Sequence, residues 1–371
     1  MSEFKELGVD ARIIKRLTEL NIIEPTEIQE QSIPFLSSKG ADFIGMSQTG
    51  TGKTAAYSIP LLQNINVKNN NVQALILAPT RELVQQIAKN IFKFTKYYKP
   101  IFSVSITGGP NMAKQLSLLN KNTHIIVATP GRLMDLLDKQ KVNLENLKYV
   151  VLDEADEMLK LGFKEDIEQI LSYSKGKVNT WLFSATLPQD IKKLIQKHLR
   201  VNAHSVIISE KTVLNKNIKH EYISCNTAEK LNTLIQYLKK NQINRGLLFC
   251  KTKKATALLT KQLKSKNIVC EAIQGDLTQL EREKVMRAFK NESLGFLIST
   301  DVSARGIDVE NLDNVIHYEM PDQIDYYTHR SGRTARGGRK GLSIAFVDDK
   351  ELALLKKISK TLNFQINETI L

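Results

Sequence analysis

Short apolar runs that end in polar or glycine-containing turns alternate along this chain with longer stretches of helical periodicity. This alternation is typical of a mainly parallel sheet covered by helices, because the crossovers between parallel strands lie over its faces. In the first half of the chain we expect strands over residues 42–46, 74–77, 102–106, 124–127, 149–152 and 180–183. The pattern therefore predicts an α/β protein.

A second series of apolar runs begins after residue 205 and predicts a second unit of the same kind, with strands over residues 219–223, 245–249, 269–273, 295–299, 314–317 and 342–346. Residues 209–218 are polar and lack clear periodicity, so we expect a linker there. We therefore predict a first domain over residues 1–208 and a second over 219–371. The amphipathic segment 348–362 is expected to pack on the second domain.

The charge of the chain is basic in both halves. The net charge is +14, and residues 1–205 hold 26 Lys and Arg against 20 Asp and Glu, while residues 206–371 hold 27 against 19. A basic excess in both halves suits a polyanion that lies across both domains, although many basic proteins bind no nucleic acid.

Two further features bear on the compartment. No stretch approaches the roughly 18 apolar residues of a membrane span, and the first residues lack the apolar core of a signal peptide. The cysteines, Cys225, Cys250 and Cys270, are far apart and form no Cys-x-x-Cys pair, which argues against a disulfide framework and a zinc site. We expect a cytoplasmic protein with free thiols and no membrane association.

The segment 47–54 is similar to a phosphate-binding loop. It reads Ser47, Gln48, Thr49, Gly50, Thr51, Gly52, Lys53 and Thr54, with Ser47 where the strict pattern has its first glycine. Gly50 and Gly52 can turn successive N–H groups toward a phosphate. Lys53 would contact the β- and γ-phosphates, and the Thr54 hydroxyl would bind Mg²⁺. The alternative is an ordinary glycine-rich turn between a strand and a helix.

Carboxylates follow the apolar run 149–152, where the carboxyl end of a parallel strand is expected to face a ligand. Asp153 is predicted to bind Mg²⁺, directly or through water, and Glu154 to position or deprotonate the attacking water. The alternative is an acidic helix amino terminus, which the helix dipole also stabilises.

Arg333 and Arg336 are three residues apart in the segment 329–337. On a helix this spacing places both guanidinium groups on one face, and two such cations favour an anion. A γ-phosphate in transition is the strongest candidate, reached by arginines from a second domain. The alternatives are a solvated basic face or a contact with a phosphate backbone.

These segments belong to a longer series of motifs that runs in order along the chain. In the first half they are Pro25-Thr26-Glu27-Ile28-Gln29, 47–54, Pro79-Thr80-Arg81-Glu82-Leu83, Gly108-Gly109, Thr129-Pro130-Gly131-Arg132, 153–156 and Ser184-Ala185-Thr186. In the second half they are Phe249, Gln274-Gly275-Asp276, Gln279, Arg282, Thr300-Asp301, 304–308 and 329–336. In this order the motifs resemble those of DEAD-box RNA helicases over nearly the whole chain.

The resemblance implies two tandem RecA-like domains, with ATP and Mg²⁺ as cofactors. Because no low-complexity tail follows the amphipathic segment, we expect a minimal core without an appended RNA-binding domain. It also implies that Phe4, Ile22 and Gln29 lie at the adenine, that Gly306 and Asp308 lie near the nucleotide, and that Ser184, Thr186 and His329 couple the nucleotide site to RNA. The expected RNA contacts are Arg81, Gly109, Thr129, Arg132, Thr252, Arg282 and Thr300. Such hydroxyl, glycine and arginine contacts suit phosphates and 2′-hydroxyls, so little sequence specificity is expected.

Some residues depart from the family pattern, namely Asn21, Gln274, Ser331 and Ala335. None of them is an expected phosphate ligand. We expect a monomeric ATP-dependent RNA helicase that separates short duplexes locally, while its protein partners stay open. The alternatives are an ATP-gated RNA-binding clamp and a translocase on duplex DNA.

Overall fold

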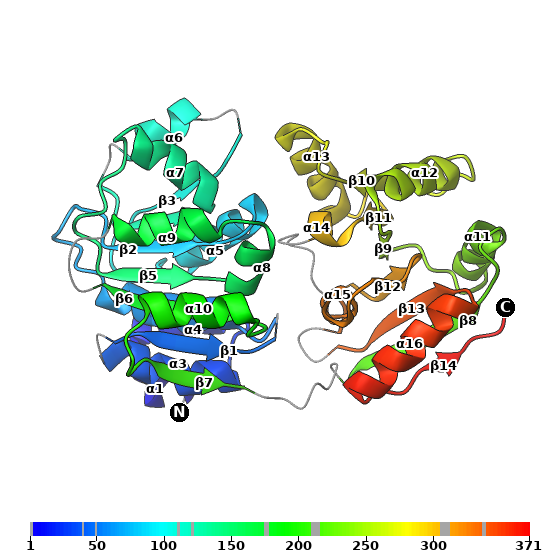
Figure 1. Cartoon of the computed structure of the whole chain (residues 1–371), viewed down its shortest axis with the longest axis horizontal. Helices are drawn as coiled ribbons and strands as arrows, with labels where there is room; N and C mark the ends of the chain where they lie inside the picture. The colour runs from blue at the N-terminus through cyan, green and yellow to red at the C-terminus, as the bar shows by residue number, and fades with distance from the viewer. Residues whose placement is uncertain are drawn as a thin grey trace. The chain divides into compact units, whose positions relative to one another are not determined.

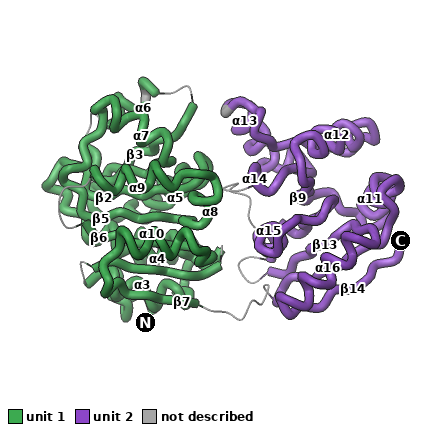
Figure 2. The backbone as a smooth tube through the Cα atoms, viewed as in Figure 1, with its two compact units in different colours: residues 1–209 green, residues 210–371 purple. Residues whose placement is uncertain are grey.

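The structure is a computed structural model of the 371-residue chain. It describes residues 3–38, 41–48, 50–109, 112–119, 122–173, 178–208, 216–304, 312–335 and 339–371. The chain divides into two compact units, Met1–Ser209 and Glu210–Leu371 (Figure 2). Each unit is built on its own sheet of parallel strands.

The sheet of the first unit has the strand order β3-β4-β2-β5-β6-β1-β7. Its strands are β1 (Phe43–Met46), β2 (Ala74–Leu77), β3 (Ser103–Ile106), β4 (Ile125–Ala128), β5 (Tyr149–Leu152), β6 (Asn179–Ser184) and β7 (His204–Ile207). All their pairings are parallel, as between Phe43 and Trp181 in β1 and β6. Parallel pairing places the carboxyl ends of the strands at one edge of the sheet.

Helices cover both faces of this sheet (Figure 1). They are α1 (Glu3–Glu6), α2 (Ala11–Glu19), α3 (Glu27–Ser38), α4 (Lys53–Asn64), α5 (Arg81–Phe94), α6 (Met112–Leu119), α7 (Pro130–Asp138), α8 (Ala155–Lys160), α9 (Lys164–Ser172) and α10 (Gln189–His198). Strand side chains alternate between two apolar clusters, so that Leu75 and Ile76 belong to different ones. Trp181 is fully buried, and its indole N–H donates to the Ala41 carbonyl at 3.2 Å.

The sheet of the second unit has the order β10-β11-β9-β12-β13-β8-β14. Its strands are β8 (Ile218–Ser224), β9 (Gly246–Phe249), β10 (Cys270–Ile273), β11 (Phe296–Ser299), β12 (Asn314–His317), β13 (Gly341–Val347) and β14 (Asn367–Glu368). Their pairings are also parallel. Like the first sheet, this one therefore collects its strand carboxyl ends at one edge.

The helices of the second unit are α11 (Lys230–Lys240), α12 (Lys253–Lys264), α13 (Gln279–Lys290), α14 (Asp301–Ala304), α15 (Ile324–Ser331) and α16 (Asp349–Leu362). Helix α16 starts with a capping box, in which Asp348 and Glu351 each bond the backbone N–H of the other. Its Leu355 and Ile358 are fully buried, which confirms that this amphipathic segment packs on the second unit.

The strand pattern of both halves is confirmed, with starts and ends within one residue of those predicted. The end strands β7 and β14 were missed: β7 exposes three of its four residues, and β14 has only two residues. The predicted linker extends one residue too far, because Ile218 already pairs with Gly341 and is buried. Residues 209–215 of that linker lie outside the described residues.

The described cysteines form no disulfide, and two of the three thiols, Cys250 and Cys270, are buried. Burial raises the pKa of Cys250 to about 12 and that of Cys270 to about 11, so both stay protonated at neutral pH. In the described part of the chain, no helix is both long enough and apolar enough to cross a membrane.

Candidate functional site

The phosphate loop follows β1 and leads directly into α4. Gly50 and Gly52 have φ angles of 83° and 89°, which are left-handed conformations that glycine adopts without strain. Lys53 begins α4, and its ammonium donates to the carbonyl oxygens of Ser47 at 2.6 Å and Gln48 at 3.1 Å. The lysine is therefore folded back over its own loop, where a phosphate would compete with these carbonyls for it.

Hydroxyl groups brace the same loop from within. The Thr51 hydroxyl donates to the Gln48 carbonyl at 2.8 Å, and the Ser47 and Thr51 hydroxyls are 2.9 Å apart. Ser47 is buried and its N–H donates to the Ser184 carbonyl at 3.2 Å. The serine at the first position thus fits the turn, and Thr49 lies outside the described residues.

Acidic side chains face Lys53 from the end of β5. Asp153 is 3% exposed and accepts a hydrogen bond from the Tyr57 hydroxyl at 2.8 Å. Burial raises the pKa of Asp153, opposed by the charge of Lys53 and the bond from Tyr57. Burial likewise lowers the pKa of Lys53, while the charges of Asp153, Glu154 and Asp156 favour its protonated form. A cation and a carboxylate thus share a buried site.

Glu154 has an unusual backbone. Its φ of 49° and ψ of 50° are left-handed, a conformation that residues other than glycine rarely adopt. Its N–H donates to Asp153 Oδ1 at 3.0 Å, and α8 begins at the next residue. Such strained positions cost about 1–3 kcal/mol and concentrate at functional sites. Glu154 therefore caps α8 and lies outside the helix itself.

Asp156 joins the acidic motif to the motif after β6. It accepts hydrogen bonds from the Thr186 N–H at 3.1 Å and the Thr186 hydroxyl at 2.6 Å. Ser184 in turn donates to the Thr186 carbonyl at 2.8 Å. Burial by itself would raise the pKa of Asp156, but the bonds from Thr186 and Ser184 outweigh it, so the pKa is lowered. Two of the three predicted coupling residues, Ser184 and Thr186, therefore contact the acidic motif directly.

The expected adenine motif also touches the phosphate loop. Gln29 is buried, its amide donates to the Gly52 carbonyl at 3.1 Å, and a Cβ at Gly52 would lie 2.3 Å from that amide nitrogen. The Thr26 hydroxyl donates to the Thr51 carbonyl at 2.7 Å. The structure places Ile22 beside the first-unit core and the Phe4 side chain inside it, 1% exposed.

The backbone conformation of Asn21 explains one departure from the family pattern. It follows α2 with a φ of 57°, while the Ile22 N–H donates to the Leu17 carbonyl at 2.9 Å and the Asn21 N–H to the Thr18 carbonyl at 3.0 Å. This helix ending needs a left-handed residue, and asparagine is the usual substitute for glycine there.

The four predicted RNA-contacting residues of the first unit gather at one sheet edge. The Arg81 guanidinium lies against Gly108 and Gly109. The approach is so close that a Cβ added to Gly108 would be 2.9 Å from it. Arg132 donates to the Gly109 carbonyl at 3.1 Å, and its Nε is 3.4 Å from Asp135. Thr129 precedes α7, which carries Arg132, and its N–H bonds the Ile106 carbonyl.

The corresponding residues of the second unit are helix caps or lie near one. Thr252 caps α12 by accepting the Ala255 N–H at 3.0 Å, and buried Thr300 caps α14 by accepting the Ser303 N–H at 3.3 Å. Arg282 on α13 donates to the Ser303 carbonyl at 2.8 Å. Thr300 and Arg282 therefore meet at Ser303.

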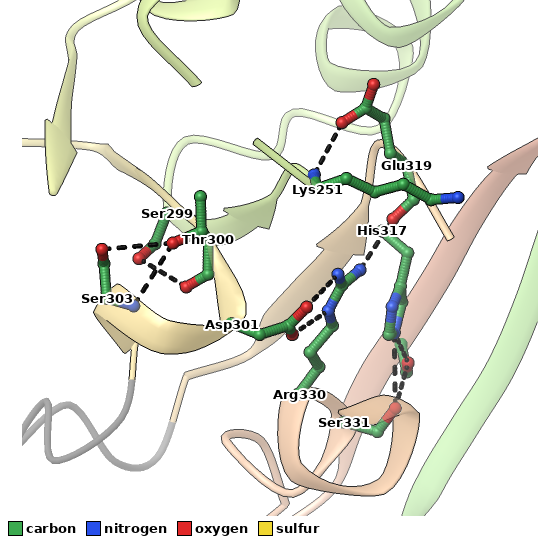
Figure 3. A network of polar contacts seen from close by, with 10 residues as sticks. Lys251, Ser299, Thr300, Asp301, Ser303, His317, Glu319, Arg330 and Ser331 are labelled. Carbon is green, nitrogen blue, oxygen red and sulfur yellow. Dashed lines mark hydrogen bonds and ion pairs between the residues drawn. The ribbon is translucent and has the colours of Figure 1, made fainter. Parts of the chain in front are cut away.

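A buried arginine that the sequence did not single out holds α14 and α15 together (Figure 3). Arg330 is 1% exposed, and its guanidinium bonds both carboxylate oxygens of Asp301, at 2.5 and 2.7 Å. The same group donates to the Glu319 carbonyl at 2.7 Å and lies 4.9 Å from the Phe249 ring centre. No local sequence signal indicated this role, because its partners Asp301 and Glu319 are distant along the chain.

Beyond Arg330 the structure corrects one prediction. Helix α15 ends at Ser331, so Arg333 lies in a turn after the helix and is not on a helical face. The helix stops because Thr334 turns toward Leu312, to whose carbonyl it donates, and Ala335 adopts a φ of 57°. Gly306, Asp308 and Arg336 lie outside the described residues, and His329 lies in the last turn of α15.

Ser331, another departure from the family pattern, joins a buried polar cluster under α15. Its hydroxyl is 2.9 Å from that of Ser343 and 3.4 Å from Nε2 of His317 (Figure 3). The His317 ring stacks on Tyr327 at 4.7 Å, and the Tyr327 hydroxyl is 3.0 Å from Nδ1 of His220. These contacts hold α15, the helix that precedes Arg333, in place.

A phosphate loop between a parallel strand and a helix, with carboxylates at a neighbouring strand end, defines the class of phosphate-loop nucleotide-binding proteins. Two family models match the chain, DEAD/DEAH box helicase over residues 26–194 and helicase conserved C-terminal domain over residues 229–338. The chain belongs to the DEAD-box helicase family.

Known relatives agree with this assignment. The chain is 38% identical over 361 residues to the ATP-dependent RNA helicase CshA of Listeria monocytogenes, an alignment that covers 97% of this chain and 69% of that protein. CshA of Geobacillus kaustophilus is also 38% identical, with 97% and 77% covered. The structure of S. cerevisiae Dbp5 bound to RNA and ADP BeF3 superposes with a TM-score of 0.90 at 31% identity, covering 100% of this chain and 96% of that one. The two units are tandem RecA-like domains.

Proposed function

We propose that this protein is an ATP-dependent RNA helicase, in which RNA-stimulated ATP hydrolysis accompanies closure of the two domains and separates short duplexes locally. The observation that carries the proposal is that the phosphate loop and its helix α4, with buried Lys53, lie beside buried Asp153 at the end of β5, which Tyr57 of α4 contacts. Family membership and RNA helicases among the relatives support it.

The donor atoms at this site suit Mg²⁺. The candidate ligands, Thr54 and Asp153, offer a hydroxyl and a carboxylate, and Mg²⁺ is usually bound by one or two carboxylates together with substrate phosphates. Bound there, Mg²⁺ would neutralise the charge that develops on the phosphates.

Protein groups then supply the remaining chemistry. Lys53 exchanges its two carbonyl partners for the β- and γ-phosphates, and Glu154 orients or deprotonates the attacking water. Gln29, together with Phe4 and Ile22, recognises the adenine. When the domains close, the nucleotide is approached by Arg333 and Arg336, with Gly306 and Asp308. RNA would stimulate the reaction because closure accompanies RNA binding.

RNA is bound mainly through its sugar-phosphate backbone. Arg81, Gly109, Thr129 and Arg132 offer guanidinium, hydroxyl and backbone groups at one edge of the first sheet, and Thr252, Arg282 and Thr300 offer the same kinds of group in the second. These groups suit phosphates and 2′-hydroxyls better than base edges. The Asp156, Ser184 and Thr186 contacts, with His329, would couple this surface to ATP.

We further propose a monomer that works in the cytoplasm, where ATP and RNA are both available. Sedimentation at several protein concentrations tests the first point, and localisation of the tagged chain tests the second.

The function is tested by measuring ATP hydrolysis with no nucleic acid, single-stranded RNA, structured RNA and DNA, together with separation of a short RNA duplex. We expect RNA to stimulate hydrolysis, DNA of the same sequence to have little effect, and ATP to be needed for strand separation. Equal stimulation by DNA would favour a DNA translocase. ATP-dependent RNA retention without strand separation would identify an RNA clamp instead.

A further inference from the structure

Basic and aromatic side chains cluster on the first unit where α2 meets the carboxyl end of α5. The basic-aromatic patch consists of Arg12, Lys15, Arg16, Lys93, Lys96, Tyr97, Tyr98 and Lys99. It has six cations, and among the described residues the carboxylates in direct contact with them are those of Asp10 and Glu19. The patch therefore keeps a clear excess of positive charge.

Two tyrosine rings hold four of these cations. The Lys15 and Lys96 ammonium groups lie 4.6 and 4.7 Å from the centre of the Tyr97 ring. Arg12 and Lys99 lie 4.8 and 5.0 Å from the centre of the Tyr98 ring. Each such contact contributes about 0.5–1 kcal/mol at exposed sites. Long side chains that would otherwise move freely are thus gathered over two half-buried rings.

Glu19 fixes the arrangement from the centre. Its carboxylate accepts hydrogen bonds from the Tyr97 hydroxyl at 2.6 Å, Arg16 at 2.6 Å and Lys96 at 3.1 Å. The bond from Tyr97 first, and then that from Arg16, lowers the pKa of Glu19 to about 2, so the carboxylate stays ionised. A cationic side chain that is already fixed by its contacts loses less conformational entropy on binding a phosphate than a mobile one does. The fixed arrangement therefore favours phosphate binding by this patch.

The patch lies at the far end of a helix that begins at a predicted RNA contact. Helix α5 starts at Arg81 and ends at Phe94 after 14 residues, and Tyr97 to Lys99 follow it. A helix of that length spans about 21 Å, which is about six base steps of a nucleic-acid strand at 3.4 Å each. Lys89 and Lys93 are exposed along the way. A strand bound at Arg81 could reach the patch along α5.

We propose that the basic-aromatic patch is a second RNA-binding surface, which holds the phosphates of an RNA strand that extends beyond the core contacts at Arg81. This inference rests on the proposed function, since it takes RNA as the polyanion already bound at the other end of α5. The patch increases affinity for long RNA without taking part in ATP hydrolysis.

The test compares a patch variant, Lys15→Gln/Lys96→Gln/Lys99→Gln, with a matched control, Lys139→Gln/Lys141→Gln/Lys192→Gln. The control lysines are exposed and belong to the same unit. Their substitution removes the same amount of charge as the patch variant does. Affinity is measured at several salt concentrations for a short RNA that fills only the core site and for one longer by about ten nucleotides, more than the span of α5.

We expect the patch variant to bind the long RNA more weakly and to lower its salt slope by about 2, since each lost phosphate contact contributes about 0.7 on a single strand. Affinity for the short RNA, its stimulation of ATP hydrolysis and the behaviour of the control should be unchanged. A second variant, Tyr97→Leu, keeps every charge but removes a ring, and should lose part of the same long-RNA affinity.

An unchanged salt slope for the long RNA would overturn the proposal. An acidic protein would then be the alternative partner for the patch. An equal loss for short and long RNA would also overturn it, because the substitutions would then act on the core site. If short RNA fails to stimulate the unmodified protein, it is the proposed function that fails.

Discussion

At the scale of single residues, the acidic motif combines burial with a strained backbone. Asp153 is buried beside Lys53, and Glu154 adopts left-handed angles that the preceding strand and following helix impose. Strain of this kind persists when the surrounding contacts over-determine the conformation. We infer that the position of the Glu154 carboxylate is maintained at a cost in stability.

Glu154→Gln should therefore keep ATP binding and lose most turnover. Glutamine has nearly the same size and shape but cannot accept a proton from water, and loss of such a group costs about 10²- to 10⁴-fold in rate. ATP affinity by equilibrium binding and single-turnover hydrolysis with RNA provide the measurement. Near-normal hydrolysis would contradict the role given to Glu154.

Asn21→Val should destabilise the first unit by about 1–2 kcal/mol, because a β-branched residue must adopt a left-handed conformation there. The matched control is Asn21→Gly, which should stay close to the unmodified protein since glycine accepts that conformation. Urea unfolding measures both. Equal stability of the two variants would show that the left-handed turn is not maintained in solution.

At the scale of elements, the contact between α14 and α15 depends on one ion pair. Arg330→Met should destabilise the second unit by about 3–5 kcal/mol, because it leaves the Asp301 carboxylate without its partner. The double variant Asp301→Leu/Arg330→Met should recover part of that loss. Thermal unfolding of the set provides the double-mutant cycle, and purely additive effects would contradict the coupling.

The histidines under α15 predict a pH dependence. Burial lowers the pKa of His220 to about 4 and that of His317 also, so the unfolded chain binds more protons than the folded one between about pH 6.5 and 4. Stability of the second unit should be full above pH 6.5 and fall as the pH drops toward 4, by about 3 kcal/mol from His220.

Amide hydrogen exchange in β8 and β12 measures this stability across the pH range. The variant His220→Gln cannot titrate at this position, so its stability should fall less steeply between pH 6.5 and 4. An identical slope in both proteins would assign the pH dependence to carboxyl groups.

Sequence patterns predicted the strands and helices better than they predicted the local turns. Tyr149–Leu152 and Asn314–His317 could be placed because buried parallel strands are continuous apolar runs between polar turns. Strand β7 could not, because its exposed edge position gives no such run. The end of α15 before Arg333 was missed, since it depends on Thr334 bonding to Leu312, a contact distant in sequence.

Among the site residues, the phosphate loop and acidic motif follow from local spacing, so both could be assigned from the chain alone. Tyr57 and Arg330 could not, because their polar groups acquire partners only when β5 and α14 are packed beside them. The role of Asn21 as a glycine substitute likewise needed its backbone angles.

At the scale of the whole molecule, the proposed mechanism divides the reaction between two units. Unit 1 carries the phosphate loop and acidic motif, and unit 2 carries Arg333. Arg333→Ala should therefore leave ATP binding largely intact but lower RNA-stimulated hydrolysis by about 10³-fold or more, as for other arginines that stabilise phosphoryl transfer. The control is Arg339→Ala, an exposed arginine nearby. Unchanged RNA-stimulated hydrolysis in Arg333→Ala would exclude the role.

The buried indole in β6 has a practical consequence. Trp181 is the one tryptophan in the chain, it lies in the first unit, and its strand ends at Ser184, which the acidic motif contacts. Excitation of this indole at long ultraviolet wavelengths therefore yields an emission signal from the first unit alone. The unlabelled protein thus carries an intrinsic fluorophore, which can follow unfolding of that unit independently of events in the second.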